Sequence, residues 1–98
     1  MQIKKLKVKD KWNRGFGILT YDTTKDRFHF KYDDNCEGYT FSDINVKNGR
    51  EFEQGTIFNV FSFDDSYARS QMIEKYNISN LSNNEMQWFF KEHCAKNN

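Results

Sequence analysis

Apolar and polar side chains alternate strictly over the first part of the chain. Leu6 and Val8 lie on one side of this pattern, and four lysines lie on the other, namely Lys5, Lys7, Lys9 and Lys11. A period of two residues predicts a half-buried strand from Lys5 to Lys11. Phe16–Tyr21 and Asp26–Tyr32 predict a second and a third strand, each preceded by a short polar turn. We therefore expect an antiparallel meander that exposes a row of ammonium groups.

Two further apolar segments complete an expected barrel. Thr56–Phe63 is rich in β-branched and aromatic residues and predicts a fourth strand, and Tyr67–Ile78 is interpreted as the last strand. Five short strands favour a closed or nearly closed barrel, because closure leaves no exposed edge strand. The expected fold class is all-β, a five-stranded barrel with a C-terminal α-helix. The expected domains are a barrel at 1–78 and a helical extension at 79–98.

The C-terminal segment has a helical pattern. Ser82 and Glu85 have capping-box spacing, which marks the start of a helix. The residues at i, i+3, i+4 and i+7 that follow form one apolar face, namely Met86, Phe89, Phe90 and His93. We expect a helix over 83–95, with Trp88 on the side opposite that face. Exposure of Trp88 together with Phe89 would indicate self-association or a protein partner.

Composition and charge narrow the function classes. The chain has 98 residues, of which 17% are aromatic, and so predicts a folded protein. No apolar run is long enough to span a membrane, and no secretory h-region follows the basic N-terminus. Two widely separated cysteines favour reduced thiols, so we expect a cytoplasmic protein. Residues 1–31 hold nine Lys/Arg against three Asp, whereas residues 32–98 are net acidic. Such asymmetry is typical of nucleic-acid contact by the basic half.

Two segments resemble the ribonucleoprotein motifs of the cold-shock domain family. Lys11–Leu19, which reads KWNRGFGIL, resembles the first motif, and Asp26–Phe30, which reads DRFHF, resembles the second. Ser42–Ile44 and the spacing of the apolar residues after it extend the resemblance to about residues 5–78. An insert at 31–41 departs from the family. The resemblance implies an OB-fold-like barrel that binds single-stranded nucleic acid.

The resemblance also implies roles for individual residues. Unpaired bases stack on aromatic side chains in such proteins, at about 1–3 kcal/mol per base, and lysines follow the phosphates. By resemblance Phe16, His29 and Phe30 stack on bases, Trp12 is a fourth candidate, and Arg14 contacts the backbone. Two departures weaken the platform, because Ile18 and Arg27 replace aromatic residues of the motifs. A guanidinium also stacks on bases. The expected nucleic-acid-binding set is Lys5, Lys7, Lys9, Lys11, Trp12, Arg14, Phe16, Arg27, His29 and Phe30.

Other chemistry finds little support in the sequence. The histidines and cysteines lack the spacing of zinc ligands, so we expect no metal and no cofactor. His29 has no second catalytic group at useful spacing, so we expect no catalytic residues and no enzyme. The predicted function is low-selectivity binding of single-stranded RNA or DNA, as in RNA chaperones and cold-shock regulators. The alternative is a protein-interaction module that uses the 31–41 insert and the C-terminal helix, or self-association through that helix.

Overall fold

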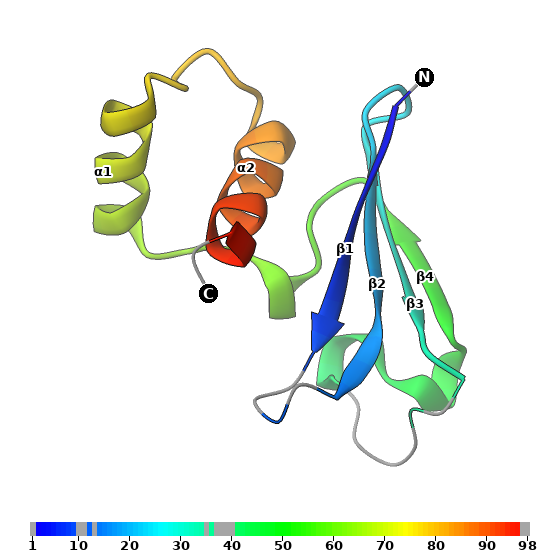
Figure 1. Ribbon diagram of the computed structural model, residues 1–98. Helices are drawn as coiled ribbons and strands as arrows, with labels where there is room; N and C mark the ends of the chain where they lie inside the picture. Colours follow the sequence, from blue (N-terminus) through cyan, green and yellow to red (C-terminus); the bar gives the residue numbers. More distant parts are fainter. Residues whose placement is uncertain (1, 10–11, 13, 35, 37–40, 97–98) are drawn as a thin grey trace. The chain divides into compact units, whose positions relative to one another are not determined.

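A computed structural model shows a small antiparallel sheet followed by two helices (Figure 1). The structure describes residues 2–9, 12, 14–34, 36 and 41–96. The chain divides into two compact units, Met1–Val60 and Phe61–Asn98. The sheet belongs to the first unit and both helices belong to the second.

The sheet has four strands in the order of the sequence. These are β1 (Ile3–Lys9), β2 (Gly15–Asp22), β3 (Arg27–Tyr32) and β4 (Glu51–Gln54), and each is antiparallel to its neighbour. The predicted meander of the first three strands is confirmed. β4 was not predicted, because four residues are too short for alternation to stand out from the surrounding loop.

Alternation gives the sheet two chemically different faces. Residues paired across strands point to the same face. The pairs Leu19 with Phe30, and Tyr21 with Phe28, therefore define an inner face of buried apolar side chains. The buried Tyr32 extends this core, and its hydroxyl donates a hydrogen bond to the carbonyl of Ile44 at 2.5 Å. The inner face is the core of the first unit.

The segment between β3 and β4 and the segment after β4 contain short 3₁₀ helices. These are η1 (Ser42–Ile44), η2 (Val46–Asn48) and η3 (Asn59–Phe61). Arg50 anchors the start of the β3–β4 connection by donating hydrogen bonds to the carbonyls of Asp33 and Cys36, at 2.9 and 3.2 Å. The connection is therefore tied to the end of β3 by a side chain that precedes β4.

The second unit consists of α1 (Ser66–Tyr76) and α2 (Asn83–Lys96). Asp65 caps α1 by accepting the Ala68 N–H at 3.0 Å. The capping box of α2 is confirmed, since the Ser82 N–H donates to the Glu85 carboxylate at 3.0 Å and the Glu85 N–H donates to the Ser82 hydroxyl at 3.2 Å. The α2 helix lies where the sequence predicted it.

The buried Gln87 amide joins α2 to the segment that precedes α1. It accepts the Phe63 N–H at 2.9 Å and donates to the Phe63 carbonyl at 3.3 Å. A side-chain amide thus satisfies both backbone groups of one residue, as a neighbouring strand would.

The predicted all-β, five-stranded OB-fold-like barrel is wrong. In the part of the chain that the structure describes, the sheet is open and four-stranded, and the fold is mixed α and β. Thr56–Phe63 is not a strand, because its buried residues Ile57, Phe58 and Phe61 do not alternate and η3 occupies part of it. Residues 67–78, predicted as the last strand, lie largely in α1.

One further feature differs from what the sequence led us to expect. Trp88, expected on the side opposite the apolar face of α2, is only 2% exposed. The condition for self-association through an exposed Trp88 and Phe89 is therefore not met.

Candidate nucleic-acid interface

The outer face of the sheet is charged. Register places Lys5, Thr20, His29 and Glu53 in one row across the strands, and Lys7, Ile18, Lys31 and Glu51 in the next. We call this surface the charged face; its cations are Lys5, Lys7, Lys9, Arg27 and Lys31, and its carboxylates on β4 are Glu51 and Glu53. Cations from β1 and carboxylates from β4 thus occupy opposite edges of one face.

The carboxylates of β4 pair with β3 and not with β1. Arg27 Nε lies 3.0 Å from Glu53 Oε2, and His29 Nε2 lies 3.5 Å from Glu51 Oε1. Among the described residues, no carboxylate lies within ion-pair distance of Lys5, Lys7 or Lys9. Lys5, Lys7 and Lys9 therefore form a row of cations on β1 that the carboxylates of β4 do not neutralise.

His29 lies on the charged face, as its alternation with the buried Phe28 and Phe30 requires. Its Nδ1 lies 3.3 Å from the Thr20 hydroxyl, which also donates to the His29 carbonyl at 3.1 Å. Thr20 and Glu51 therefore hold the imidazole from both sides. Both ring nitrogens of His29 therefore have neighbours within the sheet.

Trp12 and Arg14 lie between β1 and β2. The Arg14 guanidinium carbon lies 4.9 Å from the centroid of the indole, and Trp12 is 65% exposed. This pair follows the lysines of β1 along the chain, so a large exposed aromatic group adjoins the basic edge. Lys11, also predicted to contact phosphate, lies outside the described residues.

Phe16 occupies a β-bulge. Val8 pairs with Gly17 and Lys9 pairs with Gly15, which leaves Phe16 as the extra residue of β2. Its ring is half-buried, with its centroid 5.3 Å from that of Phe41. Phe41 in turn packs near Phe30 and Tyr32, so Phe16 is continuous with the inner aromatic cluster.

The glycines beside Phe16 have packing roles. A Cβ on Gly17 would collide with the Lys31 carbonyl and would lie 2.8 Å from the Phe30 ring. A Cβ on Gly15 would lie 2.6 Å from the Asp33 carboxylate. Close packing therefore accounts for the glycine at position 17, whatever the Phe16 ring contacts.

Phe30 is placed away from the other predicted site residues. It has no exposed surface and points to the inner face, where it packs edge-on against Tyr32. A buried ring offers no face to a base, so Phe30 is left out of the candidate interface. The alternation that places His29 outward requires this result.

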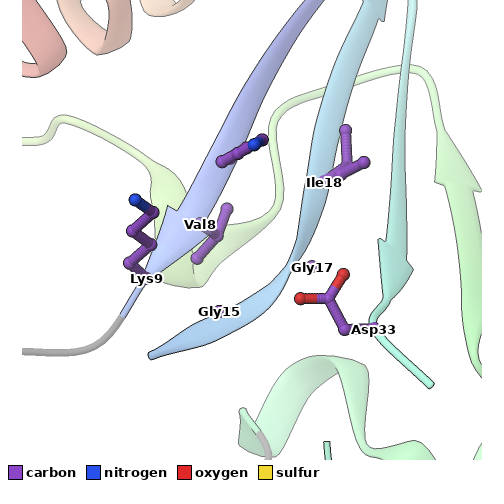
Figure 2. A pocket seen from close by; sticks show the side chains of 7 residues that line it. Val8, Lys9, Gly15, Gly17, Ile18 and Asp33 are labelled. Carbon is purple, nitrogen blue, oxygen red and sulfur yellow. The ribbon is translucent and has the colours of Figure 1, made fainter. Parts of the chain in front are cut away.

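A shallow depression of about 290 Å³ lies beside the lysines at the bulged end of β1 and β2 (Figure 2). Its lining combines cations, apolar surface, glycine backbone and one carboxylate, from Lys7, Val8, Lys9, Gly15, Gly17, Ile18 and Asp33. A second depression of about 220 Å³ shares Ile18 and Asp33 with the first and is bordered by Lys31 and Asp34. The β-bulge of β2 lies at this end of the sheet.

Sequence reasoning missed three residues of this region. Lys31 alternates with Phe30 and Tyr32 in the same way as His29, so the period-two pattern was sufficient to find it. Ile18 was treated only as a lost aromatic residue, although its 37% exposure makes it an apolar part of the charged face. Asp33 has no local signal in the sequence that links it to Gly15.

Other kinds of site find little support in the same part of the chain. No group of three or more metal-ligating side chains is present among the described residues. Both cysteines are free, with Cys36 buried and Cys94 exposed. None of the described helices has the length and apolarity needed to cross a bilayer.

Comparison with known proteins gave no match among protein-family models, curated proteins or solved structures. The resemblance to the cold-shock domain family stays a prediction.

Proposed function

We propose that this protein binds single-stranded RNA or DNA with low sequence selectivity, through the lysines of β1 and the adjoining Trp12. The observation that carries the proposal is the separation of charge on the charged face. Lys5, Lys7 and Lys9 have no carboxylate partner among the described residues, whereas the glutamates of β4 pair with Arg27 and His29. A polyanion that lies along β1 meets cations and avoids the acidic edge.

The spacing of the lysines suits an extended strand. Successive side chains on one face of a strand are about 7 Å apart, which is comparable with the separation of phosphates in an extended single strand. Lys5, Lys7 and Lys9 then follow one phosphate backbone. Because these contacts release counterions, affinity falls as salt rises.

Trp12 supports a preference for single strands over duplex. Stacking on an indole requires a base whose face is not covered by its neighbours, and such contacts tolerate any base. Arg14 lies against the indole and adds a further cation beside the stacked base. Arg27 and His29 contribute less in this proposal than the sequence predicted, because Glu53 and Glu51 engage them. No catalysis is proposed, and the expected compartment is the cytoplasm.

The test is a salt titration with matched charge variants. Fluorescence anisotropy of a labelled oligouridine of about eight nucleotides, within the range of small single-strand sites, reports the dissociation constant at several salt concentrations. Replacing Lys5, Lys7 and Lys9 by Gln is expected to reduce the slope of log K against log salt by about 2, at roughly 0.7 for each phosphate that a lysine neutralises. The control replaces Lys47, Lys75 and Lys96 by Gln, which removes the same charge from outside the sheet.

Two results would count against the proposal. Equal slopes for both triple variants would mean that net charge, and not β1, drives binding. Absence of binding to any oligonucleotide at low salt would refute the function and would favour the protein-interaction alternative. Trp12→Ala provides the second arm and is expected to weaken binding by about tenfold without changing the salt slope, which is the signature of lost stacking.

A further inference from the structure

The depression in Figure 2 places one carboxylate among cations, on a surface proposed to bind a polyanion. The backbone of Asp33 is fixed by three hydrogen bonds. Its N–H donates to the Phe16 carbonyl at 2.8 Å, and its carbonyl accepts from the Cys36 N–H and from Arg50 Nη1 at 3.1 and 2.9 Å. These hydrogen bonds therefore fix the backbone position from which the Asp33 side chain extends.

The Asp33 carboxylate has no cation within ion-pair distance among the described residues. An ionised carboxylate only accepts hydrogen bonds, through two neighbouring oxygens. A carboxylate beside phosphate-binding lysines weakens binding of the nucleic-acid backbone. Its presence there is favourable only if the ligand donates hydrogen bonds to it.

We infer that this depression is a subsite for an unpaired guanine base, recognised by Asp33 through its Watson–Crick edge. The inference rests on the proposed function and names the base that one position of the bound strand prefers. Guanine presents two adjacent donors, N1–H and the N2 amino group, which match the two oxygens of a carboxylate. The Ile18 side chain offers apolar surface to the ring, and Lys7 and Lys9 flank it for the adjoining phosphates.

The other bases fit this acceptor less well. Cytosine and adenine each present one amino group beside a ring nitrogen whose lone pair faces the second carboxylate oxygen. Uracil and thymine present one N–H between two carbonyl oxygens, which the carboxylate repels. Selectivity at this position therefore follows from the number and order of donors on the base edge.

The test compares oligouridines of about eight nucleotides that carry a single guanosine, inosine, cytidine or adenosine, by the same anisotropy titration. Guanosine is expected to bind about five- to tenfold more tightly than uridine at that position, the lower part of the range for bidentate base contacts. Inosine, which lacks the N2 amino group, is expected to lose most of this gain.

Protein variants assign the preference to Asp33. Asp33→Asn is expected to abolish it, because an amide replaces one acceptor by a donor, and to tighten binding of the all-uridine strand by removing a negative charge. Asp34→Asn is the matched control: it removes the same charge one residue away, outside the lining of the depression, and should keep the preference. Gly15→Ala displaces the carboxylate, from which the new Cβ would lie 2.6 Å, and should lower the preference without changing net charge.

The outcomes separate this inference from the function on which it rests. Salt-dependent binding of the all-uridine strand with no gain from guanosine overturns the subsite and leaves the proposed function standing. A guanosine preference that survives in Asp33→Asn also overturns it. Absence of binding to every strand at low salt overturns both.

Discussion

Gly17→Ala should strongly destabilise the first unit. Gly17 lies where β2 and β3 approach closely, opposite Tyr32. A Cβ there would collide with the main-chain carbonyl of Lys31 and would lie 2.8 Å from the ring of Phe30. Neither group can move aside to make room for the methyl group, because the carbonyl belongs to a strand and the ring is fully buried.

The expected cost is about 3 kcal/mol in the free energy of unfolding. Forcing an extra methyl group into a packed interior costs about 1–3 kcal/mol. Separating the strands also strains a ladder hydrogen bond, whose net contribution is about 1 kcal/mol. For a protein of this size such a loss corresponds to a fall in Tm of roughly 12–24 °C.

Gly15→Ala supplies the matched control. Its Cβ would meet only the carboxylate of Asp33, which is the mobile end of a side chain, so the expected cost is below about 1 kcal/mol. Urea denaturation followed by far-ultraviolet circular dichroism measures both variants against the parent. Equal destabilisation by the two substitutions would refute the reasoning, because it would show that close approach to Lys31 does not distinguish Gly17 from Gly15.

Three further predictions concern the helices and a buried thiol. Gln87→Leu should lower the free energy of unfolding by about 2–3 kcal/mol in urea denaturation, because it leaves the N–H and carbonyl of Phe63 without their partner; a loss below about 0.5 kcal/mol would contradict this. Ser82→Ala should cost about 1 kcal/mol and speed amide exchange in the first turn of α2, through loss of the cap; unchanged exchange there would refute the capping role. Burial raises the pKa of the Cys36 thiol above its usual 9.0, so the unfolded chain ionises first and stability falls as pH rises through 9 and beyond. Cys36→Ala should remove that part of the fall in pH-dependent denaturation, whereas Cys94→Ala should leave it unchanged.

The first three strands were predictable because local physics determines them. Alternation from β1 to β3 reports one buried and one wet face, and each strand pairs with its neighbour in sequence. The start of α2 was predictable for the same reason, since the Ser82–Glu85 capping box involves only neighbouring residues. Contacts between residues that are close in sequence leave a recognisable pattern in the sequence.

The last strand was predicted wrongly because the residue composition of its segment was weighed without its periodicity. Residues 67–78 contain half-buried Ala68, Arg69, Met72 and Ile73, which follow helical and not alternating spacing. Asp65 as a helix cap and Asn77 as a left-handed terminator, with φ of 54°, frame α1 on both sides. These signals were present but were outweighed by the aromatic and β-branched content of the region.

The candidate site was predictable only in part. The lysines of β1 and the outward placement of His29 follow from alternation, and the burial of Phe30 follows from it too. The pairing of Arg27 and His29 with β4 depends on a strand that the pattern did not reveal. The approach of Asp33 to Gly15 depends on the bulge and on a tertiary contact, which sequence spacing does not encode.

The neighbour-to-neighbour order of the sheet has a consequence for how the chain acquires its structure. Folding is fast when contacting residues are close in sequence, and the β1–β2 and β2–β3 pairings close only short loops. Pairing of β4 requires closure of a longer loop, residues 33–50. The helices η1 and η2 and the hydrogen bonds of Arg50 reduce the conformational freedom of that loop. During synthesis from the N-terminus, all four strands emerge before either helix. The sheet is thus able to form while the second unit is still being translated.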